Sequence, residues 1–318
     1  MAGDSATFQS YFHRRWRHLN DPHVRALAWL LNAPDLLDPD APQWRGKIAS
    51  LHEPTPATIT WLNALDKEPG PLHTYLGDQP MNRLGRYAEK LMAFFFAFNG
   101  TLAAHGLQVQ SGKNATIGEF DFLLKQGDHL LHWEFATKFY LLESNGAADL
   151  PDHFVGPNLA DTLGAKMRKI MDQQLALSLH PAASAYLPQP VSSAQALVKG
   201  WLFYYGRTPR CTATTPPPCH GFWLPAGEIG KLEADGFMVL PRLRWLAPVN
   251  AAQEQCMSSE SLIDLLTDHF TRDEMPVMIA LLHADDEGGL EETDRGFIVP
   301  DGWRDRAGER ISRMIAAA

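Results

Sequence analysis

The chain has 318 residues, of which 45% are hydrophobic and 20% are charged, and its formal net charge at pH 7 is −9. These shares are ordinary for a globular protein with a substantial core. The negative charge argues against a surface built for bulk DNA binding. It does not exclude a nuclease, because active-site acids count toward the total and binding can rest on a local basic patch.

Cysteine usage and hydropathy indicate an intracellular environment. The three cysteines, at positions 211, 219 and 256, cannot all be paired and form no disulfide framework. The first residues lack a basic stretch followed by an apolar core, so no signal peptide is expected. The longest apolar run, residues 91–98, is far shorter than a membrane span. We therefore expect a cytoplasmic protein without a membrane partner.

Residues 1–78 have a helical pattern interrupted by prolines. A helix is predicted at 23–31, with Asp21 as its N-cap. Upstream, residues 14–18 form a basic cluster with an interleaved aromatic ring. This cluster either contacts phosphates and stacks on bases, or is a solvated helix face whose Trp16 packs on the body of the protein; we favour the second interpretation.

A long amphipathic pattern follows at residues 84–105, where apolar side chains recur at helical spacing. The predicted helix is apolar nearly all round from residue 91 on, which is typical of a buried helix, and Gly100 or Gly106 can end it. Glu89 lies just before the apolar run. It is either an exposed acid paired with Arg86 or another nearby arginine, or an acid that points at a metal ion.

The next stretch predicts a β-hairpin. Residues 117–124 and 130–142 are rich in aromatic and branched side chains, and the polar turn at 125–129 contains a glycine. A short first strand is predicted before the hairpin at 107–110, ahead of a turn.

Acidic side chains interrupt the apolar runs of both hairpin strands. Side chains two positions apart share a face, so Glu119 and Asp121 point the same way, and Glu134, Ala136 and Lys138 form a second set. Carboxylates in the middle of a strand are costly to bury unless a positive charge lies beside them. The three acids outnumber the one cation of the strands, which makes a divalent cation the simplest explanation.

A helix is predicted at 159–179, followed by a strong strand at 196–205 that should join the same sheet. Gln174 falls on the apolar stripe of this helix and needs a hydrogen-bond partner, either nearby backbone or a group near substrate or water. Lys166 and Lys169 form a neighbouring stripe, which is either a solvated face or a basic patch for a phosphate backbone.

The composition changes after residue 206. Strands are predicted at 237–240 and 243–246, a helix at 258–270, and a basic helix at the C-terminal end. Cys211, Cys219 and His220 invite a zinc interpretation, but no closely spaced cysteine pair and no fourth ligand accompany them, so we do not favour it.

Two kinds of motif in this chain carry a resemblance to a known superfamily. The sequence Gly-Glu-x-Asp at 118–121, followed by Glu134 and a lysine, looks like the PD-(D/E)XK nuclease superfamily. Within it, the phrases at 85–89, 132–141 and 154–158 resemble an uncharacterised bacterial family. The resemblance implies an α/β fold with a restriction-endonuclease-like αβββαβ core, a central mixed sheet flanked by helices. This core would cover 79–206, between a helical region at 1–78 and a mixed α/β extension at 207–318.

One position departs from the superfamily pattern. The usual Glu-x-Lys would put a lysine at position 136, where this chain has Ala136, and Lys138 lies two residues further on. Along a strand, Glu134 and Lys138 are about 13 Å apart, against about 7 Å for the usual spacing. A lysine leaning back along the strand or a β-bulge could close the gap, and Lys166 could take over the work.

The resemblance also implies a function, a metal-dependent nuclease. Asp121 and Glu134 would bind Mg²⁺ or Mn²⁺, completed by Glu119 and Glu89, and Lys138 would orient the attacking water or stabilise the developing charge. The residues expected to bind substrate are Lys166, Lys169 and Gln174.

Nucleic acid is the expected partner, DNA rather than RNA, and a homodimer is plausible. His132 shares a face with Glu134 and either supports the site or packs in the core; the core role is favoured. In an alternative hypothesis the fold has lost catalysis and acts as a nucleic-acid-binding or protein-interaction module.

Overall fold

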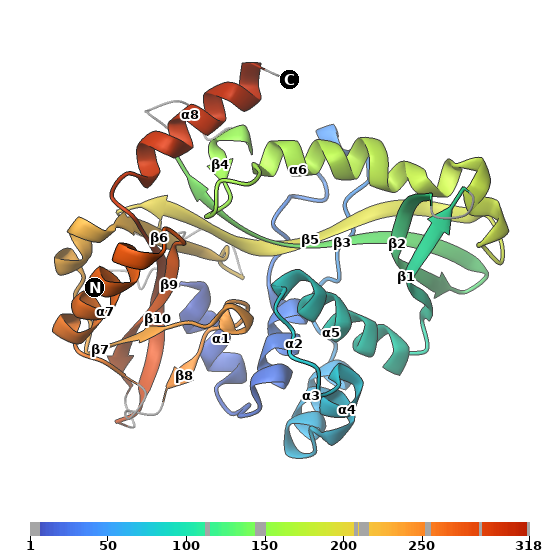
Figure 1. The fold of residues 1–318 in the computed structure, drawn as a ribbon. Coiled ribbons are helices and arrows are strands. Elements are labelled where there is room, and N and C mark those ends of the chain that lie inside the picture. Colours follow the sequence, from blue (N-terminus) through green and yellow to red (C-terminus); the bar gives the residue numbers. More distant parts are fainter. Residues whose placement is uncertain are drawn as a thin grey trace. The chain divides into compact units, whose positions relative to one another are not determined.

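The computed structural model describes residues 7–111, 115–143, 151–206, 209, 216–251, 256–285 and 288–316 (Figure 1). The helices are α1 (Phe8–Trp16), α2 (Pro22–Asn32), α3 (Pro56–Lys67), α4 (Gly70–Leu76), α5 (Leu84–Phe98), α6 (Leu163–Lys169), α7 (Ser259–Arg272) and α8 (Trp303–Ala316). The strands are β1 (Leu102–Gln110), β2 (Thr116–Gln126), β3 (His129–Leu142), β4 (Phe154–Val155), β5 (Val191–Tyr205), β6 (His220–Pro225), β7 (Gly236–Val239), β8 (Asn250–Ala251), β9 (Val277–Ala284) and β10 (Leu290–Val299). None of the described helices is long and apolar enough to span a bilayer.

The protein is a mixed α/β protein whose strands form a large mixed sheet flanked by helices. Hydrogen-bonded neighbours follow the order β1-β2-β3-β5-β6-β10-β9-β7, with β4 paired to β3 and β8 to β10. Strand β6 is parallel to both β5 and β10, whereas β1, β2 and β3 form an antiparallel meander.

The chain divides into two compact units. Unit 1 comprises Met1–His18, Phe139–Ala165 and Gly200–Ala318, and unit 2 comprises Leu19–Lys138 and Lys166–Lys199. The chain passes from one unit to the other within β3, α6 and β5, among other places. The three-part division expected from the sequence stays a prediction.

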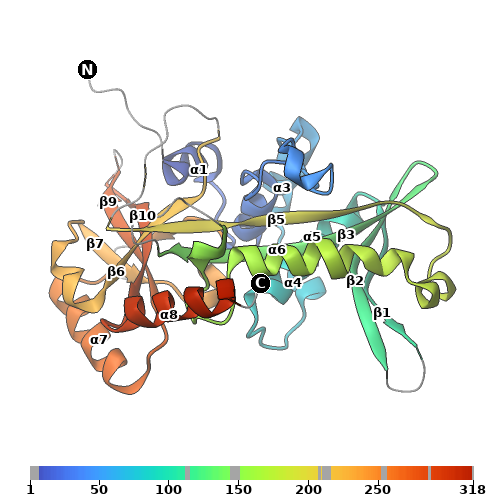
Figure 2. The ribbon, with the colours of Figure 1, turned by 90° about the horizontal axis from the view of Figure 1, so that it is seen from above.

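In unit 2, α5 lies on one face of the strands and α6, from Lys166 onward, on the other (Figure 1). Viewed from above, α6 and the turns after it run along β5 (Figure 2). Phe96 of α5 packs edge-on against Phe122 and Trp133, with ring centroids 5.2 and 5.9 Å apart. Leu177 closes the opposite face in a cluster of apolar side chains. The order helix, strand, hairpin, helix, strand along the chain is the predicted one, with the short β4 inserted.

The predicted helix at 84–105 is too long. Helix α5 ends at Phe98, because Gly100 adopts a φ of +68°, which a glycine tolerates and a continuing helix does not. Strand β1 therefore starts at Leu102 rather than at the predicted residue 107.

The predicted continuous helix at 159–179 is also wrong in detail. Leu159 has a φ of +59°, and the helix starts only at Leu163, where the Thr162 hydroxyl accepts the N–H of Ala165. After Lys169 the helix widens into a π-helical segment, Ile170–Gln174, and then tightens into a 3₁₀ helix, Leu175–Leu179. The helical path over this stretch therefore differs from a regular 3.6-residue period.

Unit 1 carries helices on both faces of its strands. Leu262 and Leu266 of α7 join Phe222, Ile279 and Ile298 in one apolar cluster. On the other face, Phe8 of α1 meets Trp201 edge-on at 5.5 Å. Trp16 is fully buried, as favoured for the basic cluster at 14–18.

The predicted strand at 243–246 is wrong. This stretch begins with a 3₁₀ helix, Arg242–Arg244, after Pro241. Its following carbonyls, at Trp245, Leu246 and Ala247, accept hydrogen bonds from the guanidinium of Arg295 instead of from a neighbouring strand.

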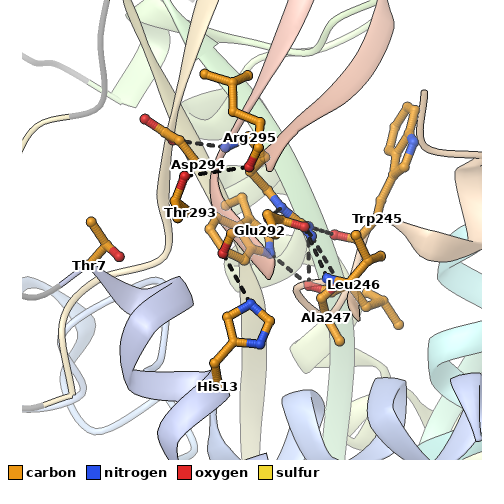
Figure 3. Close-up of polar contacts among 12 residues, drawn as sticks. Thr7, His13, Trp245, Leu246, Ala247, Glu292, Thr293, Asp294 and Arg295 are labelled. Carbon is orange, nitrogen blue, oxygen red and sulfur yellow. Dashed lines mark hydrogen bonds and ion pairs between the residues drawn. The ribbon is translucent and has the colours of Figure 1, made fainter. Parts of the chain in front are cut away.

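Arg295 and Glu292 of β10 form a fully buried ion pair in unit 1, and their side chains point toward each other in Figure 3. Arg295 also lies over the ring of Trp201, with 4.4 Å from the guanidinium carbon to the ring centroid. Glu292 accepts the N–H of Val249 at 3.0 Å, and its carbonyl accepts His13 Nε2 at 3.0 Å. The pair therefore joins four segments of this unit.

Arg295→Met is expected to lower the free energy of unfolding by about 3–5 kcal/mol, because it leaves the Glu292 carboxylate buried without its cation. Urea denaturation measures this. The double variant Glu292→Gln, Arg295→Met removes both charges and should recover part of the loss. A single variant that loses less than about 1 kcal/mol would contradict a structural role for the pair.

Candidate active site

The candidate site lies at the point where the hydrogen-bonded pairing of β2 with β3 ends. The ladder runs from Gln126 opposite His129 to Phe122 opposite Trp133, as the predicted hairpin requires, and Gly127 in its turn has a φ of +58°. The next residue of β2, Asp121, accepts the N–H of Phe135 with its carboxylate Oδ2 at 2.9 Å. The Asp121 side chain thus replaces a ladder carbonyl and is held where the two strands diverge.

Three carboxylates from two elements converge at this point. Glu89 of α5 and Glu119 and Asp121 of β2 each place a carboxylate oxygen within 4.8 Å of the others. Glu119 is exposed, and Glu89 and Asp121 are half-buried. Among the described residues, this is the one group of His, Cys, Asp and Glu side chains arranged in this way, and it could hold a metal ion.

Strand β1 supplies polar partners for two of the acids. His105 Nε2 lies 2.7 Å from Glu89 Oε1, and Gln108 Nε2 donates to Glu119 Oε2 at 3.1 Å. Gly106 lies between them with a φ of +63°, and a Cβ there would come within 3.5 Å of Glu119 Oε1. In the part of the chain that the structure describes, the side-chain partner of Glu89 is therefore His105 rather than an arginine. His105 and Gln108 were not recognised in the sequence, because the helical pattern ran through the first and no motif marked the second.

Glu134 of β3 lies in a buried hydrogen-bonded chain and is 1% exposed. Its Oε1 accepts His132 Nε2 at 2.8 Å, and its Oε2 accepts the side-chain amide of Gln174. The Gln174 oxygen in turn accepts Lys166 Nζ at 3.2 Å. Gln174 therefore finds side-chain partners rather than backbone, and the π-helical turn that ends with it delivers the amide to Glu134.

His132 is both a core residue and a partner of Glu134. Its ring is fully buried and meets Phe120 edge-on at 4.7 Å. Burial lowers the pKa of His132 to about 4, against the pull of the Asp121 charge. The ring is therefore neutral at pH 7, and its Nε2–H donates to Glu134 when that carboxyl is ionised.

Burial also sets the protonation of the two central carboxyls. It raises the pKa of Asp121 to about 7, with the charge of Glu134 adding to the effect and the N–H of Phe135 opposing it. It raises the pKa of Glu134 to about 7 as well, opposed first by Lys166. Both groups are therefore poised to gain or lose a proton near neutral pH.

The lysines gather on the α6 side. Burial lowers the pKa of Lys166, and the neighbouring charges of Lys138 and Lys169 lower it further, while Asp121 and Glu134 raise it. Lys138 lies two positions beyond Ala136 on β3. His132, Glu134 and Ala136 are buried at every second residue, and this alternation ends at Thr137 and Lys138, which are both half-buried. Lys166 is hydrogen-bonded toward Glu134 by way of Gln174.

A cleft of about 390 Å³ opens beside the acids in unit 2. Asp121 and Glu119 line it on the strand side, and Lys169, Gln173 and Gln174 line it on the helix side. Of the four predicted metal ligands, the structure brings Glu89, Glu119 and Asp121 into one group, and Glu134 lies next to that group but outside it, in the hydrogen-bonded chain with Gln174 and Lys166. Lys169 lines the cleft, and Lys138 lies near Lys166.

The proposed zinc ligands are not part of this site. Cys211 lies outside the described residues. Cys219 is buried, and burial lowers the pKa of His220 to about 4. Neither belongs to a group with metal-ligand spacing among the residues that the structure describes.

Comparison with known proteins adds a family but no chemistry. A family model described as DUF1853, a domain of unknown function, matches residues 25–299. No curated protein and no solved structure matches the chain.

Proposed function

The chain belongs to the DUF1853 family of unknown function, and we propose from its side chains that unit 2 carries a metal-dependent nuclease site that hydrolyses phosphodiester bonds. The observation that carries this proposal is the convergence of Glu89, Glu119 and Asp121 at the open end of the hairpin. Next to them, Glu134 is linked through Gln174 to the ammonium of Lys166. Carboxylates and a buried cation side by side suit a reaction in which negative charge develops on phosphate.

The donor set fits a hard divalent cation. Every candidate ligand atom is a carboxylate oxygen, which favours Mg²⁺ or Mn²⁺ over zinc. We assign Asp121 and Glu134 as the central ligands, with Glu119 and Glu89 completing the site directly or through water. The raised pKa values of Asp121 and Glu134 support this, because two such carboxylates resist ionising together unless a cation is present. A bound cation would activate a water molecule and polarise the phosphodiester.

The chain's own residues would orient the carboxylates and neutralise charge on the phosphate. The N–H of Phe135 fixes Asp121, and His132 and Gln174 hold one Glu134 oxygen each. Lys166 supplies the positive charge opposite the acids. Lys169 and Gln173 at the cleft edge contact the phosphate backbone of a nucleic acid, DNA rather than RNA, and the exposed Lys169 adds favourable charge for it.

The order of elements supports a restriction-endonuclease-like core. Along the chain α5, β1, β2, β3, α6 and β5 follow the αβββαβ order, and the acids come from the helix before the strands and from the hairpin. In this proposal Lys166 replaces the lysine that the superfamily pattern puts where this chain has Ala136.

The alternative is a degenerate site that binds nucleic acid without cutting it. The observation that favours it is Ala136 at the usual lysine position together with a Glu134 already hydrogen-bonded on both oxygens. Metal binding without cleavage would support this alternative.

Cleavage assays test the proposal directly. The full chain is incubated with single-stranded DNA, double-stranded DNA and RNA in Mg²⁺, in Mn²⁺ and in EDTA. We expect cleavage with either cation and none in EDTA. If calorimetry detects no binding of either cation at millimolar concentration, the proposal fails.

Metal affinity should depend on pH. Because the pKa values of Asp121 and Glu134 are raised to about 7, protons compete with the cation below that pH. Each displaced proton weakens apparent Mn²⁺ affinity by up to about tenfold per pH unit below the pKa. Calorimetric titration at about pH 6 and pH 8 should therefore show much tighter binding at the higher pH. Equal affinity at both would contradict a site built on these two carboxyls.

A further inference from the structure

Cationic and aromatic side chains form a stripe along α5 that is separate from the carboxylates of the candidate site. Arg86, Lys90, Phe94 and Phe98 recur every four residues, so they follow one another along one side of the helix. Such a combination of charge and planar rings is unusual for a helix whose other residues build the core of unit 2.

Trp61 of the neighbouring helix α3 stacks on two of these rings. Phe98 and Trp61 lie nearly parallel, with centroids 4.5 Å apart and planes 20° apart, and Trp61 and Phe94 are 6.0 Å and 27° apart. Tyr75 of α4 lies 5.4 Å from Phe94 with its ring tilted by 59°, so it borders the stack without joining it. We call the four rings, Tyr75, Phe94, Trp61 and Phe98, the aromatic ledge. All four lie in unit 2.

The aromatic ledge ends in solvent at both sides. Phe98 is 57% exposed and Tyr75 is 38% exposed, although both are large rings that are normally buried. With Trp61 against one face of Phe98, the exposed area of Phe98 offers a flat apolar surface that continues the stack. A stack with an open end is a place where another planar ring can be added.

Positive charge borders the ledge in a chain that is acidic overall. Lys90 donates its ammonium to the carbonyl of Leu76 at 2.8 Å, which holds the charge at the end of α4 next to Tyr75. Arg86 and Lys67 are exposed. The acid of α3, Asp66, accepts the N–H groups of Asn20 and Asp21, so its charge is directed at another segment.

We infer that the aromatic ledge binds single-stranded nucleic acid by stacking its bases, with the phosphates next to Lys90 and Arg86. Stacking needs no particular base, since every base has a planar face, and it requires that the bases be unpaired. The inference rests on the proposed function, because it makes the bound strand the substrate. Glu89 and Phe98 lie on the same helix nine residues apart, about 14 Å along its axis. Nine residues also turn the helix by about half a revolution, so the two side chains point to opposite sides of α5 and a strand that reaches both passes around the helix.

Binding of two matched probes tests the inference in EDTA, where no cleavage takes place. One is a fluorescein-labelled DNA single strand of about twelve nucleotides, and the other has the same backbone without bases. The full chain should bind the first at least about fivefold more tightly than the second. Phe98→Ala should remove this preference, and Phe98→Trp should keep it. Leu265→Ala, at an exposed leucine of α7 in unit 1, is the control and should bind as the unchanged chain does.

Two results would overturn the inference. In the first, the unchanged chain binds both probes equally, or Phe98→Ala keeps the preference. In the second, sedimentation shows that Phe98→Ala dissociates a dimer while its DNA affinity stays the same, which would make the ledge a contact between copies. Phe98 is exposed enough that the variant should fold, and its melting temperature checks this.

The same samples distinguish this inference from the nuclease proposal. Base-dependent binding without any metal-dependent cleavage would support base stacking on the aromatic ledge and contradict the nuclease proposal. Metal-dependent cleavage, together with a Phe98→Ala variant that binds DNA as tightly as the unchanged chain does, would support the nuclease proposal and contradict the inference about the ledge.

Discussion

Replacing Asp121 with asparagine is expected to abolish cleavage and, at the same time, to stabilise the metal-free protein. Asparagine keeps an oxygen that accepts the N–H of Phe135 and removes the charge that repels Glu134. Loss of a metal ligand should remove several kcal/mol of transition-state stabilisation, about a thousandfold in rate. A cleavage assay in Mn²⁺ measures it.

The effect of Asp121→Asn on the free energy of unfolding should increase as the pH rises. The pKa of Asp121 is near 4 in an unfolded chain and about 7 in the folded one, so the folded protein binds more protons between these values. Stability contributed by this group is fully present below about pH 4 and is lost as pH rises through 7. At about pH 8, Asp121→Asn should therefore raise the free energy of unfolding by about 1–2 kcal/mol in EDTA, and at about pH 5 by much less.

Adding Mn²⁺ should reverse the order of stability of the unchanged chain and Asp121→Asn. Mn²⁺ should raise the melting temperature of the unchanged chain and leave that of Asp121→Asn where it was, since binding to the folded state alone stabilises it. Asp128→Asn, at an exposed acid in the turn of the same hairpin, should behave like the unchanged chain in every assay. If Asp121→Asn were less stable in EDTA at about pH 8, Asp121 would be a structural acid rather than a metal ligand.

The hairpin and its acids could be predicted because the signals are local. Alternation with a period of two puts Glu119 and Asp121 on one side, and Gly127 marks the turn, so neither depends on distant residues. The structure adds that Asp121 takes the place of a ladder bond at the point where the strands separate.

The partners of the acids could not be predicted, for two physical reasons. His105 belongs by its pattern to the apolar run of α5, and only the positive φ of Gly100 moves it onto a strand beside Glu89. Gln174 and Lys166 are eight residues apart with the π-helical segment 170–174 between them, and Gln174 at its end bonds both Lys166 and Glu134. Sequence periodicity contains no information about a change of helix type.

This change of helix type decides which lysine we expect to act in the reaction. Lys138 is on the strand, in line with the superfamily pattern but two positions late, whereas Lys166 donates to the amide that holds Glu134. Lys138 is close enough to Lys166 for its charge to lower the pKa of Lys166. They can therefore be compared by the same substitution.

Lys166→Met is expected to lower kcat about a hundredfold, because it removes charge stabilisation at the reacting phosphate while the methionine keeps the apolar stem in place. Lys138→Met should cost less than about tenfold, because it keeps the hydrogen-bonded chain from Lys166 through Gln174 to Glu134. Both variants should keep Mn²⁺ binding by calorimetry, since neither removes a carboxylate, and Lys166→Met should bind slightly more tightly because a neighbouring cation is gone. The opposite order of kcat losses would assign the catalytic lysine to β3, and equal small losses with intact metal binding would favour the site that binds nucleic acid without cutting it.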